Sequence, residues 1–319
     1  MTGRPSLTIA IPSYRRRERL ARLLDSLASA LEGRRGDAIE VLVVLDGSDD
    51  GSDELVRDLA KFYPAPLRWT WQPNAGLSAA RNRCVDDAQG ELVWLLDDDM
   101  IASSTALEAH WDHDRTKASV LMGPCHVSTQ DPDLAHAGAF YALRHASLSA
   151  TGRATHPRDC SFANTSAPVT LLRAHRFDQR FRGYGVEDYD LGARLLAAGE
   201  WIAFDPAAGV THDFRASRSE RRRKLREEGH NKALFATVYP DRADVAFDPT
   251  AGRVERLLRR VAIGPLARPL SLGAGTTSAF AARMPRRVGR HRLMAYAELL
   301  AVYSGVASFR ANPDRQRPR

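Results

Sequence analysis

The apolar residues of the first hundred positions form short, strand-like runs that are separated by longer amphipathic stretches. Runs of this length are typical of strands buried in a sheet, and they fall at 7–11, 41–45, 67–71 and 92–96. After the first run, leucines recur at helical spacing, at Leu20, Leu23, Leu24, Leu27 and Leu31. Residues 53–62 and 78–88 also have helical composition. The alternation predicts an α/β fold, with a mostly parallel sheet flanked by helices.

Polar clusters follow three of the predicted strands, at 12–16, 46–50 and 97–99. Ligands of parallel sheets bind beyond the carboxyl ends of the strands. We therefore expect the three clusters to converge on one edge of the sheet.

After Met100 the pattern is looser. We expect helices at 104–116, 191–198 and 219–237, and strands at 120–122, 162–172, 201–204 and 209–212. The stretch before Arg158 has no clear periodicity. The compact domain is expected to end near residue 240, so the sequence predicts a domain at 1–240 and a basic, mostly helical extension at 241–319.

Composition is that of an ordinary globular protein, with 44% apolar and 27% charged residues. The net charge of +7 lies entirely in the tail: residues 251–319 hold 14 Arg, no Lys and 3 acids, so the other residues carry a net −4. We therefore expect no nucleic-acid partner. The apolar stretch Leu293–Phe309 is interrupted by Glu298. It is consistent with a packed helix, a homodimer contact or a helix at an anionic membrane surface.

Cysteine usage and the terminus predict a compartment. The three cysteines are far apart and odd in number, which argues against a disulfide framework and for a reducing environment. The first six residues lack the layout of a secretory signal, and no apolar run reaches 18 residues. The expected location is cytoplasmic, with peripheral contact at the inner face of the membrane through the tail.

The sharpest local feature is the acidic triplet, which we define as Asp97, Asp98 and Asp99. Three adjacent carboxylates repel one another, and a divalent cation relieves that cost. Oxygen ligands suit Mg²⁺ or Mn²⁺, which commonly bind substrate phosphates as well. A metal with a diphosphate ligand is one interpretation, and an acidic turn that caps the next helix is the other.

Six segments in order resemble one enzyme family. They read TIAIPSYRR, VLVVLDGSDDGS, NAGLSAARNRC, ELVWLLDDDM, FRGYGVEDYDLGARLLAAG and IAFDPAAGVTHDF. Together, from Leu7 to about Tyr239, they resemble the inverting nucleotide-sugar glycosyltransferases of family 2, which have the GT-A fold, a Rossmann-like sheet. The resemblance implies metal-dependent transfer from a nucleotide-diphosphate sugar to a carbohydrate or other hydroxyl acceptor. The donor is expected to be a UDP-sugar, with a GDP-sugar as the alternative.

The resemblance also assigns a donor site. Pro12, Ser13 and Tyr14 would line the nucleoside pocket, and Asp46 would hydrogen-bond the base. Arg81 would support the base or the diphosphate, unless it is a surface arginine of an amphipathic helix.

Within the acidic triplet, the family pattern is aspartate, any residue, aspartate. Asp97 would face the ribose or sugar, and Asp98 would be a further member of the donor site. Asp99 would bind the metal, joined in some relatives by a histidine that corresponds to His212. A structural histidine is the alternative.

Catalysis is assigned to the acids at 187 and 188. Inverting transfer needs a base that deprotonates the acceptor hydroxyl, and the family motif gives this role to its second acid, Asp188. Glu187 would orient the acceptor, and Asp190 would be structural. Acids at a helix start can also be plain capping residues. One or two of Arg215, Arg218 and Arg222 would clamp phosphate.

Two other functions are compatible with an α/β sheet and a basic tail. A non-catalytic binding protein could keep the fold while its basic tail engages a membrane or another polyanion. A nucleotidyltransferase would need a glycine-rich phosphate loop with a basic residue after the first strand, which is absent from the sequence. Retention of Asp46, Arg81, Asp99 and Asp188 together favours the enzyme.

Overall fold

The computed structural model describes residues 6–33, 38–129, 135–215, 217–247 and 290–311. The chain packs into two compact units. The larger unit consists of Met1–Phe177 with Asp188–Arg215, and the smaller of Asp178–Glu187 with Ala216–Arg319.

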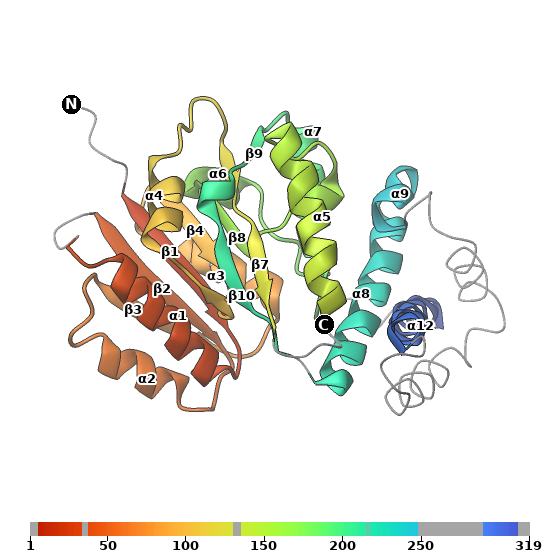
Figure 1. Cartoon of the computed structure of the whole chain (residues 1–319), viewed down its shortest axis with the longest axis horizontal. Coiled ribbons are helices and arrows are strands. Elements are labelled where there is room, and N and C mark those ends of the chain that lie inside the picture. The colour runs from red at the N-terminus through yellow and green to blue at the C-terminus, as the bar shows by residue number, and fades with distance from the viewer. Residues whose placement is uncertain (1–5, 34–37, 130–134, 216, 248–289, 312–319) are drawn as a thin grey trace. The chain divides into compact units, whose positions relative to one another are not determined.

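A seven-stranded sheet in the described residues forms the centre of the larger unit. Its strand order is β3-β2-β1-β4-β8-β6-β9, and all neighbours are parallel except β8, which runs antiparallel to β4 and β6. The predicted α/β class with a mostly parallel sheet is confirmed (Figure 1). The strands are β1 (Leu7–Ser13), β2 (Ile39–Asp46), β3 (Leu67–Gln72), β4 (Leu92–Leu96), β6 (Val120–Met122), β8 (Asn164–Pro168) and β9 (Ile202–Phe204).

Helices cover both faces of this sheet, which explains why β1, β2 and β4 are buried at every position. Along β1, Ile9 and Ile11 pack into one core and Ala10 into the other. The first core receives α1 (Arg17–Ala30), α2 (Ser52–Leu59) and α4 (Ser104–Asp112). The second receives α3 (Leu77–Asp87), α6 (Val169–Ala174) and α7 (Glu187–Ala197).

A second, three-stranded sheet brings a distant segment to the end of β4. It consists of β5 (Met100–Ile101), β10 (Val210–Asp213) and β7 (Cys125–Ser128), in the order β5-β10-β7. His212 pairs with Met100 in the antiparallel register of β10 and β5. The sheet therefore fixes His212 beside the residue that follows the acidic triplet.

Two sequence-based expectations differ from the structure after residue 122. The stretch without periodicity contains β7 and a helix, α5 (Ala135–Thr151), followed by the 3₁₀ turn η1 (Pro157–Asp159). The single strand expected at 162–172 is wrong, because the strand ends at Pro168 and α6 begins at Val169. Proline has no N–H to continue a strand ladder, and its fixed φ suits the start of a helix.

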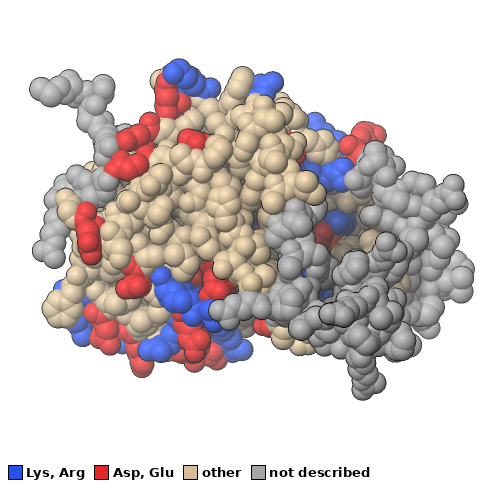
Figure 2. Space-filling model, in the orientation of Figure 1, with Lys and Arg blue, Asp and Glu red and all other residues tan. Residues whose placement is uncertain are grey.

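Surface charges on the viewed face of the larger unit are mixed in sign. Figure 2 shows acidic and basic side chains interspersed over the region of α1 and α2. On α2, Arg57 pairs with Asp53 at 3.0 Å, and just beyond it Lys61 pairs with Asp58 at 2.8 Å. Such exposed pairs contribute little stability, but they neutralise this face locally.

The smaller unit contains two helices that cross closely, α8 (Arg218–Val238) and α12 (Arg290–Ala311). Ser217 and Glu220 form a capping box at the start of α8. A side chain at Gly229 would clash with the Val302 carbonyl, and one at Gly305 with the Arg226 carbonyl. The glycines therefore permit the contact between the helices, and the 293–309 stretch is a packed helix here.

Short elements complete the smaller unit and the connection before β10. They are η3 (Pro240–Arg242), α9 (Ala243–Ala246) and, in the larger unit, η2 (Pro206–Ala208). No described helix is long and apolar enough to cross a membrane. The 1–240 domain boundary stays a prediction, although α8, which precedes it, packs with α12 beyond it.

Candidate active site

The acidic triplet begins where β4 ends, at the edge of the sheet to which the carboxyl ends of β1 and β2 also point. The Asp97 amide donates to the Ala163 carbonyl at 3.0 Å, which fixes the start of the triplet against β8. From the end of β1, the Ser13 hydroxyl donates to Asp98 Oδ2 at 2.8 Å. The structure thus brings the first and third polar clusters into contact.

Arg81 connects the triplet to Asp188. Its side chain is 1% exposed; Nη2 lies 3.0 Å from Asp97 Oδ1, and Nη1 lies 2.9 Å from Asp188 Oδ1. The guanidinium carbon lies 5.4 Å from the centre of the Phe177 ring. The alternative of a surface arginine is therefore wrong, and one buried cation holds two carboxylates far apart in sequence.

The environment of Asp188 makes its carboxylate a better base than an exposed one. Burial raises the pKa of Asp188, Arg81 opposes that rise, and the negative charge of Asp97 adds to it. Its side chain is still 18% exposed, so it is accessible at the surface of the site. A base with a raised pKa binds a proton more strongly.

Two arginines that the sequence analysis did not select contact the other members of the triplet. Arg16, at the start of α1, lies 2.8 Å from Asp98 and 3.0 Å from Asp99, and Arg19 lies 3.3 Å from Asp99. Burial raises the pKa of Asp98 to about 6 although Arg16 opposes that rise. Their signal in the sequence was a run of arginines directly after the first predicted strand.

His212 and Asp99 have a geometry that suits a shared metal ion. His212 Nε2 lies 3.5 Å from Asp99 Oδ2, and two ligands at about 2.1 Å in adjacent octahedral positions are about 3 Å apart. In the described part of the chain, no cluster of three or more His, Cys, Asp or Glu side chains could hold a metal. The pair fits an ion that takes its other ligands from phosphate and water.

The Asp46 side chain forms hydrogen bonds with the loop before α3. Its carboxylate accepts hydrogen bonds from Gln72 Nε2 at 2.7 Å and from the amides of Ala75 and Gly76, both at 2.9 Å. Asn74 donates to its carbonyl at 3.0 Å. This arrangement fixes the loop that leads to Arg81, and the base-binding role of Asp46 stays a prediction.

The remaining residues of the expected nucleoside pocket differ in exposure. Ser13 is buried against Asp98, whereas Tyr14 is 44% exposed and lies beneath the guanidinium of Arg15 at 5.4 Å. Pro12 is the sixth residue of β1 and is buried. Tyr14 is thus the member of this group whose ring is accessible to a planar ligand.

Comparison with known proteins identifies the family. The sequence model described as Glycosyl transferase family 2 matches residues 8–173, more than half of the chain. This chain belongs to glycosyl transferase family 2. The family predicted from the six segments is confirmed, and the matched residues include Ser13, Arg81 and the acidic triplet.

Among curated relatives of this family-2 chain is the succinoglycan biosynthesis protein ExoM of Rhizobium meliloti. It is 29% identical over 207 residues, which cover 64% of this chain and 65% of ExoM. The validoxylamine A glucosyltransferase of Streptomyces hygroscopicus subsp. jinggangensis is 28% identical over 230 residues, 61% of this chain and 52% of that protein. The chain thus matches less than two thirds of either relative.

Solved structures of glycosyltransferases share the fold. The mannosyltransferase PcManGT of Pyrobaculum calidifontis, in complex with GDP-Man and Mn²⁺, has a TM-score of 0.61 at 21% identity and covers 98% of this chain and 89% of its own. TarS 1–349 of S. aureus in complex with UDP has a TM-score of 0.54 at 17% identity, with 97% and 92% covered. The predicted GT-A fold of the family is confirmed.

In the smaller unit of this family-2 chain, Asn231 holds the loop at residues 182–186, which leads to Glu187. The sequence analysis did not select this residue. Buried Asn231 of α8 donates to the carbonyls of Arg182 at 3.0 Å and Gly185 at 2.9 Å. Gly183, Gly185 and Val186 have positive φ, and for a β-branched residue such as Val186 this is strained. An asparagine in the middle of a basic helix carried no sequence signal for this contact.

The basic segment after His212 was expected to clamp phosphate. Arg215 Nε instead lies 2.8 Å from Asp213 Oδ1, although its side chain is 62% exposed. In the smaller unit, the Lys224 ammonium lies 4.9 Å from the centre of the Tyr184 ring. The phosphate-binding roles of Arg215, Arg218 and Arg222 stay predictions.

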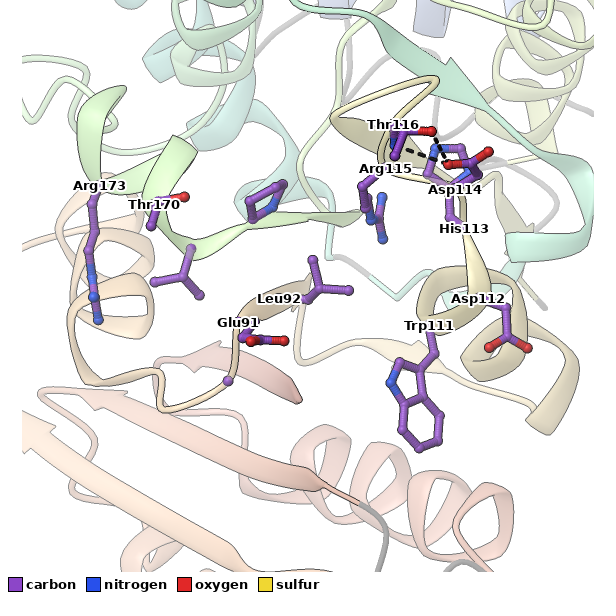
Figure 3. A pocket seen from close by; sticks show the side chains of 13 residues that line it. Glu91, Leu92, Trp111, Asp112, His113, Asp114, Arg115, Thr116, Thr170 and Arg173 are labelled. Atoms are coloured by element: carbon purple, nitrogen blue, oxygen red, sulfur yellow. Dashed lines mark hydrogen bonds between the residues drawn. The ribbon is translucent and has the colours of Figure 1, made fainter. Parts of the chain in front are cut away.

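A cavity of about 760 Å³ lies away from these residues, at the amino end of β4. Figure 3 shows Leu92 and Trp111 with Arg115 and Arg173 around it. Arg115 is held by the His110 carbonyl and the Ser166 hydroxyl, both at 2.7 Å. None of the residues predicted for donor, metal or acceptor lines this cavity, so it is separate from the candidate active site.

The cysteines play no part in the site. Cys84, Cys125 and Cys160 are free thiols and are buried, and burial raises the pKa of all three. They pack as small apolar side chains, in keeping with the expectation that the chain has no disulfide framework.

Proposed function

We propose that this chain is an inverting glycosyltransferase that moves a sugar from a nucleotide-diphosphate sugar to an acceptor hydroxyl. The observation that carries the proposal is the bridge made by Arg81 between Asp97 and Asp188. A single guanidinium spans only a few ångströms. The carboxylate assigned to the donor and the carboxylate assigned to base catalysis therefore lie within reach of one bound sugar.

Asp188 accepts the proton in the proposed reaction. The acceptor oxygen forms a bond to the anomeric carbon while its proton passes to the Asp188 carboxylate. The bond from the anomeric carbon to the diphosphate oxygen breaks, and its electron pair leaves with the nucleotide diphosphate. Attack from the face opposite the leaving group inverts the anomeric configuration. The raised pKa of Asp188 supports this role.

The other residues bind and orient the donor. Asp97 accepts hydrogen bonds from the ribose or sugar, and Tyr14 contributes an accessible ring for the base. Arg81 supplies positive charge near the diphosphate, with Asp97 and Asp188 as its partners in the free protein. Glu187, which begins α7, orients the acceptor.

Asp99 and His212 are proposed to hold Mn²⁺ or Mg²⁺. A divalent ion bound there would neutralise charge on the departing diphosphate. The support is the 3.5 Å separation of the two donor atoms, together with the Mn²⁺ present beside GDP-Man in the related mannosyltransferase structure.

The donor is proposed to be a UDP-sugar, with a GDP-sugar as the alternative. Neighbouring folds contain UDP in one case and GDP-Man in another. The relatives named above act in succinoglycan biosynthesis or on validoxylamine A, which is in keeping with a carbohydrate or other hydroxyl-bearing acceptor.

The test is a donor screen that also reports stereochemistry. UDP- and GDP-sugars are incubated with the full chain and Mn²⁺, first alone and then with hydroxyl acceptors; nucleotide release is measured, and the product anomer is assigned by NMR. We expect one nucleotide class to react, with inversion and with loss of activity in EDTA. A product that retains the donor's configuration would refute the mechanism, and no release from any donor would count against the function.

A further inference from the structure

The acidic triplet has a positive counter-charge at the start of α1. We call it the α1 arginine pair: Arg16, directly before the helix, and Arg19 in its first turn. Arg16 Nη1 donates to Asp98 Oδ1 at 2.8 Å and to Asp99 Oδ2 at 3.0 Å. Arg19 Nη1 donates to the same Asp99 oxygen at 3.3 Å. Asp98 and Asp99 are 3% and 7% exposed, so this charge compensation takes place largely out of water.

The contacted oxygen is also the one that faces His212. Asp99 Oδ2 therefore has two guanidinium groups and an imidazole around it. A divalent cation bound to this oxygen would lie within a few ångströms of Arg16 and would be repelled by it. A diphosphate in the same place would attract both the cation and the arginine.

The α1 arginine pair differs from a purely structural ion pair in its position. The Arg16 side chain is 32% exposed, so part of it is open to a ligand. Attachment of α1 to the segment around β10 is already provided by Arg22, whose Nη2 lies 2.6 Å from Asp213, and by Arg19, which donates to the Arg215 carbonyl. Arg16 is therefore directed at the triplet.

We propose that Arg16 is a diphosphate-binding residue that occupies Asp99 in the free protein and makes the metal and the donor bind as a pair. Before the donor arrives, Arg16 neutralises Asp98 and Asp99 and opposes the metal. When the diphosphate is bound, Arg16 moves its hydrogen bonds to phosphate oxygens and leaves Asp99 to the metal. Arg19 assists at the same oxygen. The proposal rests on the proposed function for the identity of the ligand.

The experiment measures Mn²⁺ and nucleotide binding separately in wild type and Arg16→Gln. Free Mn²⁺ is followed by EPR in the absence of nucleotide, and UDP and GDP binding by calorimetry without metal. Removal of the charge should tighten Mn²⁺ binding and weaken nucleotide binding, each by about tenfold, the size expected for one partly solvated charge at this distance. A structural defect would weaken both ligands together.

Arg17→Gln is the matched control. Arg17 is also adjacent to Arg16, but it is exposed, and its Nε donates to the Gly51 carbonyl at 3.2 Å, away from the acidic triplet. We expect this variant to bind Mn²⁺ and nucleotide as the wild type does. An equal effect of both substitutions would show a general loss of positive charge and would overturn the assignment to Arg16.

Arg19→Gln keeps the proposal testable if Arg16→Gln does not fold. Arg19 is 3.3 Å from Asp99 and does not contact Asp98. We therefore expect this variant also to bind Mn²⁺ more tightly and nucleotide more weakly than the wild type, but by less than Arg16→Gln. Mn²⁺ binding that is unchanged or weaker in the folded variant would overturn the proposal. If the wild type binds neither UDP nor GDP even with Mn²⁺ present, the proposed function fails, and the Mn²⁺ titration still decides whether the arginine opposes the metal.

Discussion

Asp188→Asn separates the base role of this residue from a role in folding. The substitution keeps the size of the side chain and leaves an amide oxygen that can accept from Arg81, which now lies 2.9 Å from Asp188 Oδ1. It removes the ability to take a proton from the acceptor. Transfer should therefore collapse while the donor still binds.

The expected magnitudes are far enough apart to be measured independently. Loss of a general base lowers the rate by about 10²–10⁴, which corresponds to about 3–5 kcal/mol in the barrier. Arg81 keeps Asp97 as a charged partner at 3.0 Å, so the loss in unfolding free energy should stay below about 2 kcal/mol. A domain with ordinary stability remains almost fully folded after such a loss.

The assay combines transfer rates, donor binding and urea denaturation on the same preparations. In the wild type, the raised pKa of Asp188 predicts that the acid limb of the rate has its midpoint above that of an ordinary aspartate, about 3.9. The variant should lack this limb. Asp86→Asn is the matched control, because Asp86 also pairs with an arginine, Arg176, but both side chains are 43% exposed.

Near-normal transfer by Asp188→Asn with a competent acceptor would remove Asp188 from the mechanism. It would support the helix-capping interpretation, because asparagine caps a helix about as well as aspartate. Glu187 would then be the next residue to substitute.

Other consequences of the structure concern stability and metal binding. Glu40 accepts from Thr8 and from the Gln89 amide; burial raises its pKa, but these bonds and the Arg68 pair outweigh that and lower it. Glu40→Gln should therefore cost about 1–3 kcal/mol in urea denaturation at pH 7. The difference should shrink as the pH falls below about 4.3, because the stabilising ionised form is then lost from the wild type too; a constant difference would contradict this. Gly229→Ala should lower the free energy of unfolding by about 1–3 kcal/mol, because the alanine methyl group would clash with the backbone of α12. An unchanged melting temperature would mean that α8 and α12 do not pack this way. EDTA should abolish the Mn²⁺-dependent part of the thermal shift given by nucleotide, and Asp99→Ala should do the same without EDTA; a shift that survives both would exclude Asp99 as a metal ligand.

The strands and the edge that carries the site were determined by the sequence itself. Continuous apolar runs such as Val41–Leu45 mark strands covered on both faces, and β2 is buried at all eight positions. The polar residues that follow these runs lie at the carboxyl ends of the strands. In a parallel sheet these ends lie at one edge, where ligands bind. The location of the acidic triplet therefore followed from periodicity alone.

The boundary between a strand and the helix that follows it is harder to predict from the sequence. Ala167 of β8 and Val169 and Leu172 of α6 pack into one core, so hydropathy did not show where the strand ended. Pro168 marks the break, but proline also occurs at strand ends. Hydropathy along the sequence indicates whether a residue is buried more clearly than it indicates whether the backbone there is strand or helix.

Only the tertiary structure decided which charges meet. Arg81 precedes Asp97 by 16 residues and Asp188 by 107 residues, and Arg16 lies 83 residues before Asp99. No local period connects such positions. Hydrophobic burial is a property of each residue and its near neighbours, whereas an ion pair depends on how strands and helices from distant segments come together at one edge of the sheet, and this is set by the packing of the whole unit.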